Sequence, residues 1–316
     1  MPNASRHSAL RIAKGAFIAA LAAAIAYALV REWGALASAA AAARPRWGML
    51  ALACALVLVN YALLVEAWRS VLQGWGARLR FWDGARIWSI SNLARYIPGK
   101  VWQMGSMGVM AQAQGVSGVA AAGSALIVTL IHTVAGFVVL AATGANVLHV
   151  PVEGSIAIAA LGAALLLAPN LLPWLGALAS RLSRRSFTVP RLPHRAIWTA
   201  AAISALSWIV YGLAFRAMTA GVVGHATGAP GLYIAVFTGS YLAGFLALIV
   251  PGGVGVREVV MATALQRAGL GGGEALLIVV ASRIWLTLLE LIPALFFLAR
   301  RRARRDRPHG TAETTL

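Results

Sequence analysis

The chain alternates between long apolar runs and short segments that carry most of its charge. Six runs are longer than about 18 residues, the length at which an apolar stretch is typical of a membrane-spanning helix. We predict that each run crosses the membrane once. The predicted spans are residues 15–37, 47–67, 119–142, 152–172, 196–222 and 275–299.

Two further segments break this pattern. Residues 81–114 are amphipathic and contain a Pro-Gly pair at 98–99, and residues 232–269 are apolar but contain a Pro-Gly-Gly triplet at 251–253. The limb after each break is about 15 residues long, which is too short to cross about 30 Å of hydrocarbon at 1.5 Å per residue. We therefore predict two re-entrant helical hairpins, each of which returns to the side from which it entered.

Composition places the chain among polytopic all-α membrane proteins. Hydrophobic residues make up 60% of the sequence and charged residues 11%, and residues 1–316 are predicted to form a single membrane domain. The first apolar run is too long for a secretory signal and is taken as a retained helix. The one cysteine, Cys54, excludes a disulfide framework, and we expect neither a metal nor a cofactor.

The net charge of +18 would indicate a nucleic-acid partner in a soluble protein, but here the arginines fall in short segments between spans. Basic segments lie at the N-terminus, after the second span, after the fourth span and in the tail 300–316. A cytoplasmic N-terminus places all four on the cytoplasmic side, as the positive-inside rule requires. The exceptions are Arg31, Arg44 and Arg46, which fall outside.

The predicted topology makes the two hairpins enter from opposite sides, because three spans separate them. Their sequences are also similar: "PGKVWQMGSMGVMAQAQGVSG" is set against "PGGVGVREVVMATALQRAGLGG". We predict an inverted repeat with halves at about 81–142 and 232–299. Paired broken helices of this kind mark the substrate site of many transporters. The alternative is that proline and glycine kink two ordinary helices.

Ionisable residues near the breaks are candidates for binding an anion. A helix that restarts after a break presents free N–H groups and partial positive charge, which suit a phosphate. The alternative is a purely structural ion-pair cluster, in which two glutamates neutralise two arginines; His132 is either a proton relay or simply hydrogen-bonded. The candidates from this argument are Arg95, Lys100, Arg257, Glu258, Arg283 and Glu290.

The stretches "NLARYIPGKVW" and "PGGVGVRE" resemble the two most recognisable motifs of the lysylphosphatidylglycerol synthase transmembrane-region family. The resemblance covers about residues 10–300 and implies a lipid-handling, flippase-like domain in the bacterial cytoplasmic membrane. No segment corresponds to a soluble aminoacyl-transferase domain, so we do not expect lysine transfer by this chain. The positions that the resemblance adds to the predicted substrate site are Asn92, Tyr96, Pro98, Gly99, Trp102, Pro251, Gly252, Gly253 and Gly255. The predicted site also includes Gln103, the residue after Trp102.

Two functions remain open from the sequence. The first is a translocator that moves an anionic phospholipid or a polyprenyl-phosphate-linked lipid between leaflets through a cationic mid-membrane site. The second is an integral-membrane glycosyl- or acyltransferase that uses a lipid-phosphate donor, with Glu258 as the possible general base. The expected partners are anionic membrane lipids and, for a scaffold role, a lipid-synthesis enzyme; no nucleic acid is expected.

Overall fold

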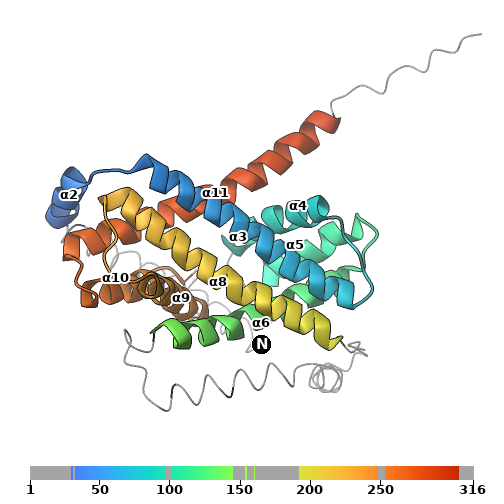
Figure 1. Ribbon diagram of the computed structural model, residues 1–316. Helices are drawn as coiled ribbons and strands as arrows, with labels where there is room; N and C mark the ends of the chain where they lie inside the picture. Colours follow the sequence, from blue (N-terminus) through green and yellow to red (C-terminus); the bar gives the residue numbers. More distant parts are fainter. Residues whose placement is uncertain are drawn as a thin grey trace, which may run out of the picture.

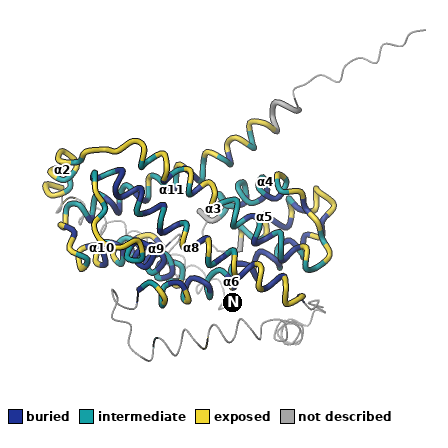
Figure 2. Tube along the Cα trace, viewed as in Figure 1, coloured by how far each residue is buried: buried dark blue, intermediate teal, exposed yellow. Residues whose placement is uncertain are grey.

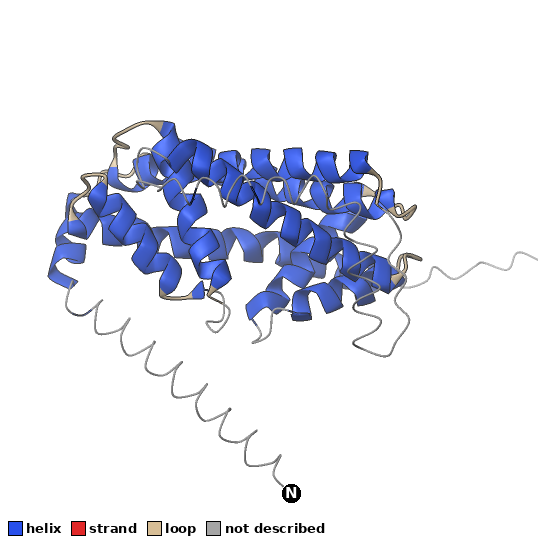
Figure 3. Cartoon of the chain, turned by 90° about the horizontal axis from the view of Figure 1, so that it is seen from below, coloured by secondary structure: helices blue, strands red, loops and turns tan. Residues whose placement is uncertain are grey.

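The computed structural model describes residues 33–96, 101–144, 192–247 and 253–305, together with the single residues 30, 154 and 160. Within these ranges the regular structure is entirely helical, as Figure 3 shows. The helices, labelled as in Figure 1, are α2 (Trp33–Ala42), α3 (Trp47–Gly74), α4 (Phe81–Asn92), the short 3₁₀ helix η1 (Leu93–Tyr96), α5 (Val101–Gln112), α6 (Gly118–Gly144), α8 (His194–Val223), α9 (Pro230–Leu246), α10 (Val256–Arg267) and α11 (Gly272–Arg305).

Four of the six predicted spans are confirmed as helices long and apolar enough to cross a membrane: α3, α6, α8 and the part of α11 from Gly272 to Arg300. They contain 27 to 30 residues, or more than about 40 Å at 1.5 Å per residue. The predicted span 152–172 lies outside the described ranges apart from single residues, and the span 15–37 is described only at its end, where α2 begins. The chain is thus a polytopic helical membrane protein.

Helices α3 and α8 lie side by side and antiparallel (Figure 1). At the start of α3, the Arg46 backbone N–H donates to the Gly221 carbonyl at 2.8 Å. At the other end, Gly74 approaches Ala196 so closely that an added Cβ would lie 2.9 Å from the alanine methyl carbon. These contacts define two ends of the bundle, which we call the Trp47 end and the Gly74 end.

The other two long helices join the same two ends. Helix α6 begins at the Gly74 end, where Trp68 Nε1 donates to Ser124 Oγ at 2.9 Å. Helix α11 begins at the Trp47 end, because Gly273 lies against the Ala35 backbone of α2, the helix that precedes α3. Helices α3 and α11 therefore run in one direction and α6 and α8 in the other. The predicted topology requires this order, because it places the span 152–172 between α6 and α8.

Each interrupted segment contains two separate helices rather than one long helix. Helices α5 and α10 have 12 residues each, or about 18 Å of length. The pair α4 and α5 starts and ends beside the Gly74 end, and the pair α9 and α10 starts and ends beside the Trp47 end; Figure 1 shows the pairs at opposite sides of the molecule. Residues 97–100 and 248–252, which include the predicted break residues Pro98, Gly99, Pro251 and Gly252, lie outside the described ranges.

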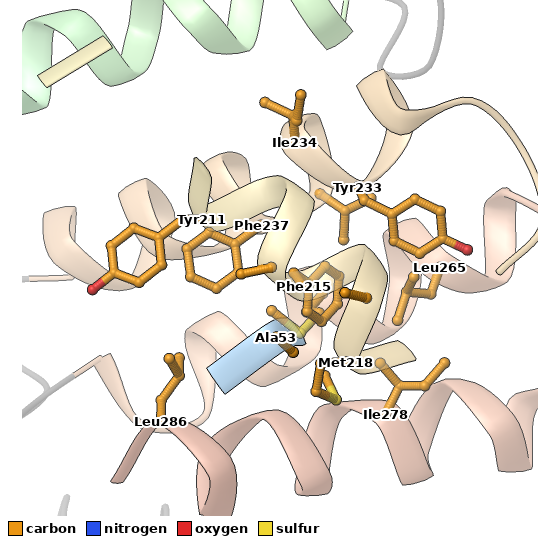
Figure 4. Close-up of a cluster of buried hydrophobic side chains, with 14 of the residues drawn as sticks. Ala53, Tyr211, Phe215, Met218, Tyr233, Ile234, Phe237, Leu265, Ile278 and Leu286 are labelled. Carbon is orange, nitrogen blue, oxygen red and sulfur yellow. The ribbon is translucent and has the colours of Figure 1, made fainter. Parts of the chain in front are cut away.

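Buried apolar side chains form two clusters, one toward each end of the long helices. Figure 2 marks the buried residues along these helices in dark blue. The cluster toward the Trp47 end is centred on aromatic residues of α8 and α9, including Phe215 and Phe237 (Figure 4). The cluster toward the Gly74 end is centred on Trp68, Leu72 and Ile87, and it includes α4, α5 and the first half of α6. Each interrupted segment is therefore packed into its own apolar core.

Gly212 allows α8 and α9 to approach each other, and its replacement by alanine is expected to destabilise the protein. The new Cβ would lie 2.8 Å from Ile234 Cβ and closer still to the backbone Cα of that residue. Because backbone cannot rotate away, we expect a loss of about 3 kcal/mol, measured by thermal unfolding in detergent. Gly48→Ala is the control, since nothing lies within 4 Å of its added Cβ; equal melting temperatures for the two variants would contradict this prediction.

Candidate functional site

The second break is built from glycines that allow α10 to begin against α9. Gly253 has φ +66°, and a Cβ at that position would lie 2.6 Å from the Gly244 carbonyl oxygen. Gly255 has φ +89° and is the N-cap residue of α10. Side-chain-bearing residues rarely adopt such positive φ values. The positive φ values, and at Gly253 the close contact with Gly244, therefore favour glycine at both positions.

Glu258 makes two interactions at once. One carboxylate oxygen accepts the Gly255 backbone N–H at 2.5 Å, which caps the first turn of α10. The other accepts from Arg283 Nε on α11, so the two side chains form an ion pair between the helices. An ion pair between Glu258 and Arg283, one of those considered from the sequence, is thus present. Glu290 lies on α11 seven positions after Arg283 and is partly buried.

Arg257, unlike Arg283, contacts aromatic rings rather than a carboxylate in the part of the chain that the structure describes. Its side chain is buried, with 7% of the residue exposed, and its guanidinium carbon lies 5.2 Å from the ring centroids of both Phe237 and Tyr241. Among the described residues, Arg257 forms no ion pair with a carboxylate, and its Nη2 has no hydrogen-bond partner. Cation–π contact stabilises the charge without neutralising it, so this guanidinium remains able to bind an anion.

The rings of Phe237 and Tyr241 contact further aromatic rings on α8. Tyr211 stacks on Phe237 with 5.0 Å between ring centroids, and Trp208 meets Tyr241 edge-on at 5.4 Å. We call Phe237 and Tyr241, which contact Arg257 directly, the aromatic seat. The sequence analysis missed the aromatic seat, although its two members are four residues apart and therefore share one face of α9. Only packing of α10 against α9 identifies the cation that they hold.

The first break is described on its two flanks. Gln103 Nε2 donates to Asn92 Oδ1 at 3.2 Å, which joins the end of α4 to the start of α5. Trp102 is 55% exposed. Arg95 and Tyr96 belong to η1, but their side chains are not described. Of the other predicted site residues, Pro98, Gly99, Lys100, Pro251 and Gly252 lie outside the described residues.

Helix α11 packs against both interrupted segments. Its Arg283 contacts α10 through Glu258, and α11 also packs against α4 and η1, the turn that contains Arg95. The structure therefore brings together Arg257, Glu258 and Arg283 in one cluster and Asn92 with Gln103 in another. Both clusters lie on elements that contact the same helix.

The described part of the chain has no group of three or more His, Cys, Asp or Glu side chains that could hold a metal ion. Its charged groups at the second break are instead an ion pair and a buried guanidinium on aromatic rings. This chemistry suits the binding of a negatively charged group.

Long antiparallel spans combined with interrupted, cation-bearing helices define a class: polytopic membrane proteins with a polar site inside the helical bundle. The sequence model described as "Lysylphosphatidylglycerol synthase TM region" matches residues 12–294, and the chain belongs to this family. The resemblance of the two motifs to this family is thereby confirmed. A comparison with curated proteins found no match.

Proposed function

We propose that this protein is a flippase-like lipid translocator that moves an anionic lipid, either a phospholipid or a polyprenyl-phosphate-linked lipid, between leaflets. Family membership supports a function connected with membrane lipids. The observation that carries the proposal is Arg257, a buried cation held by aromatic rings at the start of an interrupted helix. Burying a charge without a carboxylate is unfavourable unless a ligand or another polar group compensates it.

The packing pattern supports an inverted repeat that is longer than the sequence indicated. The elements α3, α4, α5 and α6 correspond in order to α8, α9, α10 and α11. Under this exchange, contacts of α4 with α11 correspond to contacts of α9 with α6, and contacts of α3 with α6 correspond to those of α8 with α11. Helices α3 and α8 exchange with each other, so the contact between them is unchanged by the exchange. Such an arrangement is expected of two repeats related by a two-fold axis.

In the proposed mechanism, the anionic headgroup binds between the two breaks while the acyl or isoprenoid tail stays in lipid. Arg257 and the free N–H groups in the first turn of α10 form one side of the site. Arg283, Arg95 and Lys100 complete it, with Asn92 and Gln103 fixing the first break. Alternate opening of the two interrupted segments, one toward each leaflet, would then expose the headgroup to either side.

We place the Gly74 end on the cytoplasmic side, with both chain termini there. Arg78 and Arg80 lie in the connection between α3 and α4, and Arg195 lies in the first turn of α8, all at that end. The basic end of α11 extends beyond the bundle on the same side (Figure 1). Arg46 is an exception to the positive-inside pattern, and its position at the Trp47 end has a local structural explanation. It lies beside the C-terminal end of α8, where its N–H satisfies the Gly221 carbonyl and its charge complements the helix dipole.

The geometry favours translocation over the transferase alternative. A general base needs a carboxylate oxygen that is available to the substrate. Both oxygens of Glu258 already accept hydrogen bonds, from Gly255 and from Arg283. We therefore assign Glu258 the role of a positioning residue that holds α10 against α11.

The proposal is tested with the purified protein in liposomes, using fluorescent phosphatidylglycerol and phosphatidylcholine and a membrane-impermeant quencher. We expect protein-dependent movement of the anionic lipid, about tenfold faster than that of the zwitterionic lipid, because a charge-assisted hydrogen bond contributes about 1.5–3 kcal/mol. Unlabelled polyprenyl phosphate is added as a competitor. Stronger inhibition by it than by unlabelled phosphatidylglycerol would mean that the polyprenyl-phosphate class is preferred. Movement no faster than in protein-free liposomes would refute the proposal, and product formation from a lipid-linked donor would favour the transferase.

A further inference from the structure

The interval between the two apolar clusters, at the middle of the long helices, contains the polar side chains of Asn60, Ser204, Ser207 and His132. Asn60 is on α3, Ser204 and Ser207 are on α8, and all three are fully buried; His132 is on α6. On α8, the cluster toward the Gly74 end reaches Ala201, and the other cluster begins at Trp208. On α3 and α6, too, the polar residue falls between the last member of one cluster and the first member of the other.

Asn60, Ser207 and His132 lie at about the same depth, and Ser204 lies one turn before Ser207 on α8. Asn60 is 14 residues after Arg46 (60 − 46), and Ser207 is 14 residues before Gly221 (221 − 207); Arg46 and Gly221 are hydrogen-bonded partners of the antiparallel pair. Asn60 and Ser207 therefore face the same level of the α3–α8 contact. The next residue, Trp208, donates through Nε1 to the His132 carbonyl at 2.8 Å, which fixes α6 at this level.

These side chains also differ in their hydrogen bonding from several other polar residues of the helical bundle. Ser124, Thr129 and Ser240 donate to backbone carbonyls three or four residues earlier in their own helices. By contrast, Nδ2 and Oδ1 of Asn60, the two hydroxyls of Ser204 and Ser207, and Nδ1 of His132 are buried without a hydrogen-bond partner among the described residues. Unpaired polar groups at membrane depth cost several kcal/mol each.

We propose that Asn60, Ser204, Ser207 and the imidazole of His132 form an internal site that binds water molecules at the middle of the membrane. The ligand is inferred from the chemistry of the groups. An amide N–H₂ and hydroxyls donate, while the amide oxygen, hydroxyl oxygens and an imidazole nitrogen accept. Water can satisfy both kinds of group and typically needs two to four polar partners. A metal cation would leave the amide donors unsatisfied.

The water site adjoins the aromatic residues beneath Arg257. The His132 ring stacks on Trp208 at 4.4 Å, Trp208 meets Tyr241 at 5.4 Å, and Tyr241 contacts the Arg257 guanidinium at 5.2 Å. The site nevertheless stands independently of lipid translocation, because it depends on buried polar groups that no step of the proposed transport uses.

The direct test is water-edited solid-state NMR on the full-length protein in liposomes with ¹⁵N-labelled asparagine. The Asn60 signal is identified as the one lost in Asn60→Leu. We expect magnetisation to pass from water to the Asn60 amide on the time scale of bound water, although the residue is fully buried. Absence of that transfer, while it reaches the partly exposed Asn92, would overturn the inference.

A thermal measurement provides an independent test with a matched control. If water joins these groups, Ser207→Ala leaves the others without their shared partner and lowers the melting temperature. If the site is dry, the same change removes an unpaired hydroxyl and raises the melting temperature. Ser240→Ala is the control, because Ser240 is equally buried but donates to the Phe237 carbonyl of its own helix. A melting temperature of Ser207→Ala above that of the control overturns the inference.

Discussion

Replacing Arg257 by methionine is expected to slow translocation of the anionic lipid at least about tenfold without loss of folding stability. The guanidinium supplies a charge-assisted contact to the headgroup in the proposed site, and loss of such a contact corresponds to about 1.5–3 kcal/mol. Methionine keeps much of the side-chain volume and packs well against the aromatic rings of Phe237 and Tyr241. The measurement is the initial rate of fluorescent phosphatidylglycerol movement in liposomes.

The expected stability of Arg257→Met follows from the cost of burying a charge. Replacing a buried charge by an apolar side chain of similar size is often neutral or stabilising, because the cost of removing the charge from water disappears. We therefore expect Arg257→Met to melt at the wild-type temperature or above it. A variant that transports poorly only because it unfolds would melt lower, so the two readouts separate a binding role from a structural one.

Two further variants separate the effect of this position and of the guanidinium from that of positive charge in general. Arg267→Met removes an arginine from the exposed end of the same short helix, α10, and should leave transport unchanged. Arg257→Lys keeps the positive charge but loses the planar, multiply donating guanidinium, so it should retain part of the activity. Full transport by Arg257→Met would rule out the assigned site, even if the wild-type protein is a translocator.

Glu258→Gln is expected to destabilise the protein by about 2 kcal/mol. The glutamine oxygen still accepts the Gly255 N–H, so the cap on α10 is largely retained, but the ion pair with Arg283 between α10 and α11 is lost. The side chains of Arg283 and Glu258 are 32% and 24% exposed, and removal of one charge from a partly buried pair leaves the other poorly compensated. Thermal unfolding in detergent provides the measurement.

The matched control for this change is Glu66→Gln. Glu66 also forms an ion pair with an arginine, Arg69; the side chains of Arg69 and Glu66 are 16% and 42% exposed. Arg69 also donates through Nε to the Leu79 carbonyl, a hydrogen bond that remains when Glu66 loses its charge, so we expect this variant to lose no more than about 1 kcal/mol. Combining Glu258→Gln with Arg283→Gln should cost less than the sum of the single changes. If the double variant loses as much stability as the two single variants together, the ion pair does not couple α10 to α11.

The candidate site was predictable from sequence at the level of residue type and position relative to the breaks. The motif containing Arg257 and Glu258 was identified because proline and glycine interrupt an apolar segment next to charged residues. Which carboxylate pairs with which cation was not predictable, because Glu258 is adjacent to Arg257 in sequence yet pairs with Arg283, 25 residues away. Successive residues of a helix point about 100° apart, so neighbours in sequence turn toward different helices.

The sequence by itself determined the class of the protein, the positions of the long spans and the location of the two interrupted segments. These properties follow from local rules, since the length of an apolar run and the presence of proline and glycine act on the residues nearby. Only the tertiary structure decided that Arg257 rests on Phe237 and Tyr241, that α4 and α9 each pack on the long helix of the opposite half, and that Asn60 and Ser207 lie at one level between two apolar cores. These pairings depend on the directions in which separate helices present their side chains when they pack, and hydropathy along a chain carries no information about that choice.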